Sequence, residues 1–236
     1  MTLEFSRYDV RQYPTVSVTD GYGAWSGHYE QTVNEEMDIA LLERLTSVRW
    51  NDTAAAADLA CGTGRTGAWL HVHGVRHIDG VDLTPAMLDR ASARHIYRSL
   101  RIADIVDTGL RSEAFDLVTQ SLADEHLPDL VPLYREVARL LRAGGRFVIV
   151  GYHPFFLLNG VPTHFHRPSD DQPVTIRSYV HFMSDHVAAA LAAGFSLTEM
   201  HERIVDDAWV AVKPKWAKYR DRPVSFVMVW TRRVER

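Results

Sequence analysis

Apolar and polar stretches alternate regularly along the chain from Ala54 onward. Short apolar runs bounded by turn residues give way to segments in which apolar residues recur at helical spacing. This alternation is typical of β-α-β units, in which helices join parallel strands. We therefore expect an α/β fold with a parallel sheet. The expected strands are 54–60, 77–83, 97–102, 115–121 and 146–152, and the expected helices follow Gly64 and span 85–95 and 130–141.

The pattern changes after the fifth strand. Residues 153–175 are rich in Pro, His and Asp, and a loop of that length is rarely only a connection. Because long loops often carry function, we expect a substrate-side insertion here. The basic and aromatic segment 208–223 is predicted to be a solvated loop, with a flap as the alternative. A helix at 176–193 and closing strands at 196–205 and 224–230 complete the prediction.

Composition narrows the class of protein. The 236 residues, 46% of them hydrophobic, fit one domain over 1–236. A net charge of −4 argues against nucleic-acid binding, which requires a basic surface. The single cysteine, Cys61, favours a reducing compartment, and the sequence has neither a signal peptide nor a membrane-spanning apolar stretch, so we expect a cytoplasmic protein with no membrane partner. The scattered histidines lack the spacing of a zinc site, so no metal is expected.

The most informative segment is DLACGTGRTG, residues 58–67. Gly62 and Gly64 fall in the predicted turn between strand and helix, where the lack of a side chain lets a ligand approach the backbone. Together with Gly67 they also match the dinucleotide fingerprint GxGxxG, and Asp82 follows Gly62 by 20 residues, where a ribose-binding acid belongs. The turn alone therefore does not decide the cofactor.

Three carboxylates at successive strand ends help to distinguish a dinucleotide from another nucleoside cofactor. Asp58, at the mouth of the turn, is a poor neighbour for a pyrophosphate and a good one for an ammonium group. Asp82 is suited to accept two hydrogen bonds from a ribose diol. Asp104 would lie at the next position along the same sheet edge, where it can accept from an adenine amino group. The spacing therefore favours one extended nucleoside ligand.

On these residues the chain resembles the class I S-adenosylmethionine-dependent methyltransferases, in the group that contains many small-molecule and quinone methyltransferases. The resemblance runs from about Asp58 to Tyr152. It implies a Rossmann-like, doubly wound sheet of seven strands in the order 3-2-1-4-5-7-6, with the last strand antiparallel. The cofactor it implies is S-adenosylmethionine, with S-adenosylhomocysteine as product. The motifs that carry it are DLACGTGRTG, GVDLTPAML, RIADI, FDLVTQSLADEHLPDL and LYREVARLLRAGGRFVIVGY.

The resemblance also implies which residues hold the cofactor. Asp58 and the turn backbone would bind the methionine part, Asp82 the ribose, and Asp104 with the Ile105 amide the adenine. Two positions depart from the family pattern: Ala60 stands where the family has its first turn glycine, and Glu125 precedes His126 where the family commonly has paired histidines. The full predicted set is Tyr22, Tyr29, Asp58, Ala60, Gly62, Gly64, Arg65, Asp82, Leu83, Met87, Asp104, Ile105, Ser121 and His126.

The resemblance further predicts an N-terminal helical lid over about residues 1–35. The segment GYGAWSGHYEQ carries Tyr22, Trp25 and Tyr29, and an aromatic face attracts a cation such as a sulfonium. An ordinary aromatic core cluster is an equally good interpretation of the same residues.

Methyl transfer needs no obligatory catalytic motif, because the sulfonium is already activated and the protein mainly aligns the acceptor. A hydroxyl acceptor would benefit from a base. His153 and His166 are the candidates, with His164 and His126 as further ones, and for each a structural role is the alternative. Four aromatic residues can wall an acceptor pocket or belong to the core: Tyr152, Phe155, Phe156 and Trp209.

These observations predict an enzyme that transfers a methyl group to an oxygen, nitrogen or carbon atom of a small-molecule acceptor, as a monomer or homodimer. The alternatives are a protein that binds S-adenosylmethionine without methylating and a nicotinamide-dependent oxidoreductase, for which no convincing YxxxK pattern is present. SLAD follows the fourth strand where many nucleic-acid methyltransferases have an NPPY-like sequence. A protein methyltransferase is a further alternative.

Overall fold

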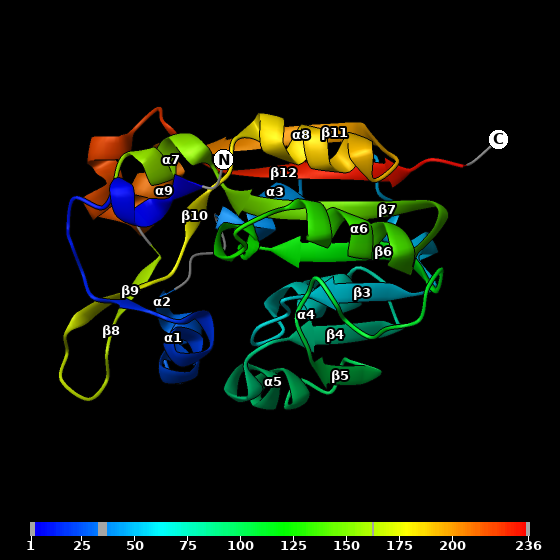
Figure 1. Ribbon diagram of the computed structural model, residues 1–236, viewed down its shortest axis with the longest axis horizontal. Helices are drawn as coiled ribbons and strands as arrows, with labels where there is room; N and C mark the ends of the chain where they lie inside the picture. Colours follow the sequence, from blue (N-terminus) through cyan, green and yellow to red (C-terminus); the bar gives the residue numbers. More distant parts are fainter. Residues whose placement is uncertain (1–2, 33–36, 162, 235–236) are drawn as a thin grey trace.

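The computed structural model describes residues 3–32, 37–161 and 163–234. Within these ranges seven strands form one sheet in the order β11-β12-β7-β6-β3-β4-β5 (Figure 1). Strand β12 is antiparallel to both of its neighbours, whereas the other pairs are parallel. Numbered along the chain, the order is 3-2-1-4-5-7-6, so the predicted topology is confirmed. The strands are β3 (Ala56–Leu59), β4 (Ile78–Asp82), β5 (Ser99–Ile102), β6 (Phe115–Ser121), β7 (Leu141–Tyr152), β11 (Phe195–Ile204) and β12 (Pro223–Arg232).

Helices cover both faces of this sheet, so its central strands are buried on both sides. Along β7, Phe147 and Ile149 join the core on one face, whereas Val148 and Val150 join the core on the other. This burial explains the continuous apolar run in the sequence, which differs from the alternation of a half-exposed strand. The covering helices are α3 (Ile39–Leu42), α4 (Arg65–Val72), α5 (Pro85–Ser92), α6 (Val131–Leu140) and α8 (Met183–Ala192), with a short 3-10 turn η3 (Trp50–Asp52) before β3.

The spacing of apolar residues in helix α6 determines which face of the helix packs on the sheet. Leu133, Val137 and Leu140 recur at helical spacing and are all fully buried against the sheet. Burying each such side chain stabilises the fold by about 1.5–3 kcal/mol. The helix ends at Leu140, and β7 begins directly at Leu141 rather than at the predicted Arg146, because residues 113 and 114 already pair with the last carbonyls of the helix.

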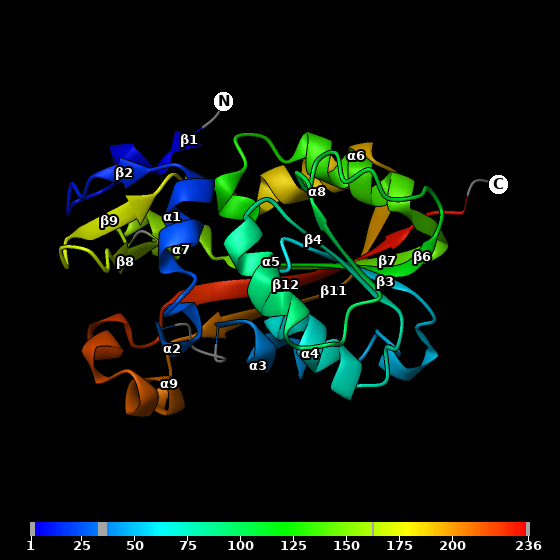
Figure 2. The same ribbon diagram turned by 90° about the horizontal axis from the view of Figure 1, so that it is seen from below.

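The N-terminal segment and the region after β7 form a second layer beyond the carboxyl ends of the parallel strands (Figures 1 and 2). Two small sheets join these distant parts of the chain, since β1 pairs with β10 and β2 pairs with β9, which also pairs with β8. The elements are β1 (Leu3–Glu4), η1 (Phe5–Arg7), β2 (Thr15–Val16), α1 (Val18–Trp25), α2 (Tyr29–Thr32), α7 (Pro154–Leu158), β8 (His164–His166), β9 (Pro173–Ile176) and β10 (Tyr179–Val180).

The predicted lid is therefore partly a β structure. Its helices α1 and α2 are present, but residues 15–16 and 3–4 are strands. Residues 1–2 and 33–35 of the predicted lid lie outside the described residues. Each interpretation of the N-terminal aromatic residues has some support. Trp25 stacks on Phe165 at 5.4 Å between ring centroids, as in a core cluster. Tyr22 and Tyr29 line the cavity described below, as in a lid.

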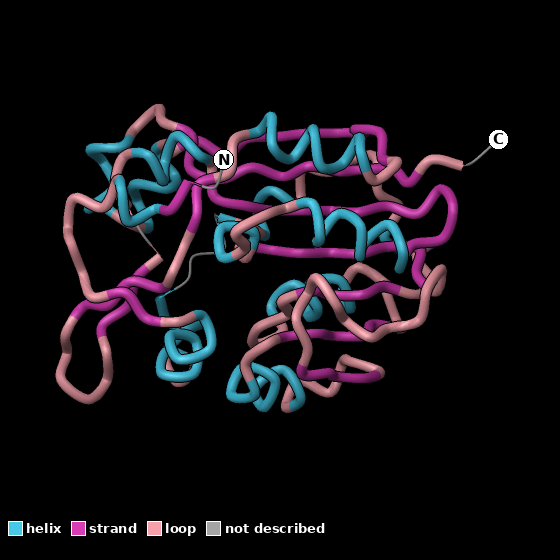
Figure 3. The backbone as a smooth tube through the Cα atoms, in the orientation of Figure 1, coloured by secondary structure: helices cyan, strands magenta, loops and turns pink. Residues whose placement is uncertain are grey.

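Three predictions of local structure are wrong, for residues 153–175, 176–193 and 208–223. The helix expected over 176–193 begins only at Met183, because Thr175 and Ile176 pair with β2 and the Asp185 carboxylate caps the new helix by accepting from the Phe182 amide at 2.8 Å. Figure 3 shows strands in this region and in the loop predicted over 153–175.

The segment 208–223, predicted to be a loop, is mostly helical. It holds most of α9 (Asp207–Val212) and all of η5 (Pro214–Tyr219). Trp209 is fully buried and packs against Trp216 at 5.1 Å between ring centroids, so tertiary packing overrides the polar local sequence. None of the helices within the described ranges is long and apolar enough to cross a lipid bilayer.

A buried polar hub anchors the first turn to the sheet. Asp58, at 1% exposure, accepts hydrogen bonds from the Tyr97 hydroxyl at 2.7 Å and from the Thr119 hydroxyl at 2.9 Å. Tyr97 reaches Asp58 by passing over Gly67, where an added Cβ would lie 2.1 Å from the tyrosine oxygen. The glycine predicted as part of a dinucleotide fingerprint thus serves close packing between α4 and Tyr97.

Gly67→Ala is expected to lower the free energy of unfolding by about 1–3 kcal/mol, because the methyl group would displace Tyr97 from Asp58. Urea unfolding followed by circular dichroism measures the change. The matched control is Gly23→Ala in α1, where nothing lies within 4 Å of the added Cβ, so no loss of stability is expected there. Equal stability of the Gly67 variant and the parent would contradict the packing role.

Asp58 should also make stability depend on pH. Burial raises the pKa of Asp58 to about 6, whereas an unfolded aspartate titrates near about 3.9. Between these values the unfolded chain has released a proton that the folded chain retains, so this contribution to stability is lost as the pH rises from 4 to 6. Asp58→Asn removes it, and the stability difference, parent minus variant, should fall by about 2–3 kcal/mol between pH 4 and pH 7. A difference that stays constant with pH would refute the raised pKa.

Candidate functional site

A cavity of about 190 Å³ lies at the carboxyl ends of β3, β4 and β6, closed on the opposite side by α1 and α2. In an open α/β sheet this edge is where ligands bind, because the strand order reverses there and the loops leave a crevice. Eleven of the fourteen predicted cofactor residues line this cavity, and Asp58, Gly64 and Arg65 do not.

The turn after β3 presents its backbone to the cavity. Ala60 and Gly62 both adopt left-handed backbone conformations, at φ +52° and +55°. An added Cβ on Gly62 would meet no protein atom nearer than the Ala60 carbonyl oxygen at 4.0 Å. Gly62 is therefore not required by the protein's own packing, and the open space beside it is the feature expected where a ligand approaches the backbone.

The remaining residues predicted from this turn act within the protein. Asp58 is held by Tyr97 and Thr119 beneath the turn. Gly64 is the N-cap of α4, at φ +85°, and an added Cβ would lie 2.9 Å from Arg94. Arg65 donates to Asp38 at 2.9 Å. Their predicted contacts with a cofactor remain predictions.

Asp82 joins the ends of two neighbouring strands at the cavity wall. One carboxylate oxygen accepts from the Gly62 amide and the other from the Thr84 amide, both at 2.8 Å. Burial raises the pKa of Asp82, and the two amides oppose that shift. The Thr84 hydroxyl and the Leu83 amide also act on this carboxylate. Because a carboxylate oxygen can accept more than one hydrogen bond, Asp82 can still accept from a hydroxyl donor such as a ribose.

Apolar side chains continue the wall after Asp82. Leu83 is 41% exposed although it is a large apolar residue, whereas Met87 is buried. Both line the cavity. They would provide the apolar contact that the resemblance predicts for a nucleoside.

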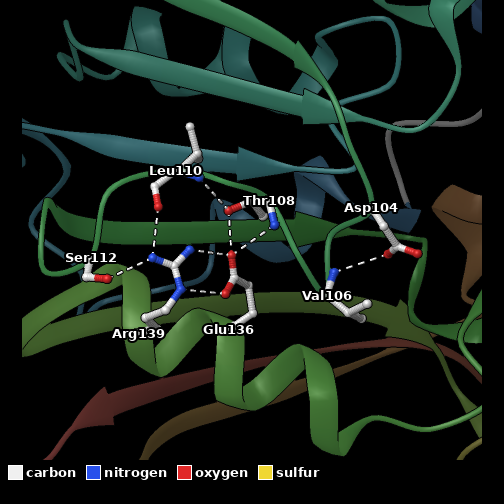
Figure 4. Close-up of polar contacts among 7 residues, drawn as sticks. All are labelled: Asp104, Val106, Thr108, Leu110, Ser112, Glu136 and Arg139. Atoms are coloured by element: carbon white, nitrogen blue, oxygen red, sulfur yellow. Dashed lines mark hydrogen bonds and ion pairs between the residues drawn. The ribbon is translucent and has the colours of Figure 1, made fainter.

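The loop after β5 carries Asp104 and Ile105 to the same cavity. One Asp104 oxygen accepts from the Val106 amide at 3.1 Å. Farther along, the Thr108 amide donates to Glu136 of α6 at 3.0 Å, and Arg139 donates to the same carboxylate and to the Leu110 carbonyl (Figure 4). Helix α6 thus holds the loop that positions Asp104.

The remaining wall is aromatic and polar. Tyr22 of α1 lies 2.8 Å from His126, measured from its hydroxyl oxygen to Nε2, and 6.0 Å from Tyr29 between ring centroids. The Ser121 hydroxyl is buried and has no hydrogen-bond partner among the described residues. Such a group is satisfied when a ligand or water binds beside it. Tyr22, Tyr29, Ser121 and His126 all line the cavity.

The predicted bases His153 and His166 do not line this cavity. His153 caps α7 by accepting from the Phe155 amide at 3.1 Å, and its other ring nitrogen lies 2.9 Å from Glu202. Burial lowers the pKa of His153. His166 bonds to the Asp171 carbonyl at 3.0 Å, and more than half of its side chain is exposed. These contacts favour the structural alternative for both residues.

Among the described residues, His126 is the histidine that reaches the cavity. His164 instead contacts Arg11 at 3.1 Å. No cluster of three or more metal-ligating side chains occurs in the described part of the chain. Six further residues line the cavity that the sequence analysis did not predict, because none of these residue types marks a binding site: Val18, Thr84, Leu122, Ala123, Leu127 and Pro128.

Comparison with known proteins agrees with this geometry. Residues 57–149 match the family model of a methyltransferase domain. Tocopherol O-methyltransferase of Arabidopsis thaliana is 30% identical over 99 residues, which are 39% of this chain and 28% of that protein. Across the curated relatives compared, the chain aligns with at most half of the relative's length.

Solved structures share the fold over more of the chain. An S-adenosylmethionine-dependent methyltransferase from Mesorhizobium loti superposes with a TM-score of 0.68 at 24% identity, covering 84% of this chain and 98% of that one. The [4+2]-cyclase SpnF superposes with a TM-score of 0.65 at 14% identity, covering 94% and 99%. The shared fold and the matched domain model agree with the predicted cofactor class, S-adenosylmethionine. Residues 57–149 are a methyltransferase domain, and the chain has the class I fold of S-adenosylmethionine-dependent methyltransferases.

Proposed function

We propose that this chain is an enzyme that transfers a methyl group from S-adenosylmethionine to a small-molecule acceptor in the cavity between the sheet edge and α1. The observation that carries the proposal is Asp82, which is buried at the end of β4 and tied to the Gly62 amide in the segment that matches the methyltransferase domain. The proposed acceptor atom is an oxygen, nitrogen or carbon.

The residues present fit the cofactor. Asp82 has acceptor positions left for the ribose hydroxyls, Leu83 and Met87 supply apolar contact for the nucleoside, and Gly62 leaves the backbone open to close approach. Asp104 and the Ile105 amide would hold the adenine. Asp58 would support the turn from beneath through Tyr97, without lining the cavity.

When bound, the cofactor supplies an activated methyl group on a positively charged sulfur. The protein then has to orient the acceptor, exclude water and stabilise a cation. The aromatic faces of Tyr22 and Tyr29 suit the cation. Burial, with a smaller contribution from the nearby Glu125 and Asp82 carboxyl groups, raises the pKa of both tyrosines, and the same two acids would attract a cation bound there.

The volume of the cavity supports a lid function for the N-terminal segment. At about 190 Å³, the cavity is smaller than the roughly 300–1,000 Å³ of typical ligand pockets. Cofactor and acceptor together therefore require α1 and α2 to move outward, which fits the predicted lid.

The proposal also includes a single domain over 1–236 and a monomer or homodimer. The lone, buried Cys61 supports a cytoplasmic location.

A role without methylation is the second candidate. The [4+2]-cyclase SpnF has the same fold over nearly its whole length, and function resides in the site rather than in the fold. The nicotinamide-dependent oxidoreductase has less support, because residues 57–149 match the model of a methyltransferase domain.

The deciding experiment incubates the purified protein and isotopically methyl-labelled S-adenosylmethionine with a metabolite extract and analyses the products by mass spectrometry. Calorimetric titration with the cofactor runs in parallel. A labelled product would support the methyltransferase. Cofactor binding without a labelled product would favour the second candidate, and absence of binding would overturn the proposal.

Asp82→Ala is expected to weaken S-adenosylmethionine binding by about 1–3 kcal/mol, because the ribose loses its hydrogen-bond acceptors. Isothermal titration calorimetry measures the affinity, and thermal unfolding checks that the variant is folded. Asp89→Ala on the exposed surface of α5 is the matched control and should bind like the parent. Unchanged affinity in a folded Asp82 variant would remove this residue from the binding site.

A further inference from the structure

The hydrogen bonds of His126 determine which of its ring nitrogens carries the proton. Nδ1 lies 2.7 Å from the carbonyl oxygen of Arg177. A carbonyl oxygen can only accept, so Nδ1 must be the protonated nitrogen. In the neutral ring, Nε2 is then left with a free lone pair. This nitrogen lies 2.8 Å from the Tyr22 hydroxyl, so Tyr22 donates and His126 accepts.

The Tyr22 hydroxyl can donate its proton and can also accept a hydrogen bond through its oxygen. Burial raises the pKa of Tyr22 well above its usual range, so its hydroxyl stays protonated at neutral pH. Tyr22 lines the cavity, and its oxygen retains a lone pair that can accept a hydrogen bond from a ligand there. The pair is therefore oriented to take a proton from the cavity and pass it to Nε2.

A buried carboxylate stands behind the acceptor nitrogen. Glu125 is 1% exposed at its side chain, and its Oε1 lies 3.6 Å from His126 Nε2 and 3.3 Å from the Thr163 hydroxyl. Its other oxygen is buried with no hydrogen-bond partner among the described residues. A proton arriving at Nε2 would create a cation next to this carboxylate, which stabilises the charge.

Resting on the proposed function, we propose that Tyr22 and His126 form a proton relay that activates a hydroxyl-bearing acceptor, with Glu125 as a positioning residue. The acceptor hydroxyl gives its proton to the Tyr22 oxygen while the Tyr22 proton moves to His126 Nε2. The acceptor oxygen uses its electron pair to form the new bond to the methyl carbon, and the carbon–sulfur bond breaks with its electrons staying on sulfur. One positive charge thus moves from sulfur to the His126 ring.

The relay selects a class of acceptor. A neutral amine brings its own lone pair and needs no base before transfer, whereas an alcohol or a weakly acidic phenol must lose its proton. The hydrogen bonds from His126 to Arg177 and from Tyr22 to His126 prepare the site to remove a proton. Such a site is suited to O-methylation of hydroxyl groups. An acceptor that is already ionised at the assay pH should not need the relay.

The first test requires no turnover. Nitrogen-15 NMR of histidine-labelled protein identifies the tautomer of each ring, and the signal lost in His126→Gln assigns His126. The expected result is a neutral His126 ring protonated at Nδ1. A ring protonated at Nε2 would overturn the relay, because that nitrogen could not accept from Tyr22.

The second test measures methyl transfer from labelled S-adenosylmethionine to a series of simple phenols of increasing acidity, ending with 4-nitrophenol, and to matched anilines. Tyr22→Phe and His126→Gln should lower kcat at least tenfold for weakly acidic phenols. For the ionised nitrophenol the loss should be less than threefold. Tyr13→Phe is the matched control, since Tyr13 also lies next to a histidine, 5.8 Å from His164 between ring centroids, but does not line the cavity.

The outcomes separate the two proposals. An equal loss for all phenols would assign Tyr22 and His126 a structural role and overturn the relay. Methylation of anilines only, or of no member of either series by a protein that binds the cofactor, would also overturn it and leave the cofactor assignment intact. Failure to bind S-adenosylmethionine in calorimetry would instead overturn the proposed function.

Discussion

The candidate site depends on the hydrogen bonds that the Asp82 carboxylate accepts from the backbone of two turns. The Gly62 amide follows β3 and the Thr84 amide follows β4, so one side chain fixes the relative position of two strand ends. Beneath it, the Asp58 carboxylate accepts hydrogen bonds from the Tyr97 and Thr119 hydroxyls. The loops of the cavity floor are tied to a buried sheet, whereas its roof, α1 and α2, belongs to a second layer that small sheets hold together.

The central part of the fold could be predicted from sequence because each strand there is buried on both faces and each helix buries one stripe. The apolar run at 146–152 and the spacing of Leu133, Val137 and Leu140 carry that information locally. The strands at Thr15–Val16 and Pro173–Ile176 could not be predicted in the same way. They are short and pair with partners about 160 residues apart in sequence, and a strand pair of that length has no periodicity to detect.

The same reasoning explains which site residues the sequence could identify. Residues such as Asp82 and Gly62 belong to turns whose geometry follows from the strand and helix around them, so their motif predicts their place. A catalytic histidine has no such local signature. His153 was a reasonable candidate from its position after β7, but its ring nitrogens are taken by the Phe155 amide and Glu202. His126 is distinguished by Arg177 and Tyr22, which come from distant parts of the chain.

The buried acids around the cavity also explain why a cationic ligand suits it. Burial raises the pKa of Asp82, and that of Glu125 as well, which means that each is costly to keep ionised in the free protein. A positively charged sulfur placed nearby would offset part of that cost. A ligand that is cationic before reaction should therefore bind more tightly than its neutral product, which no longer compensates the carboxylates. In the proposed relay the charge would remain on His126, beside Glu125, so that this carboxylate would keep a cationic partner when the neutral product leaves.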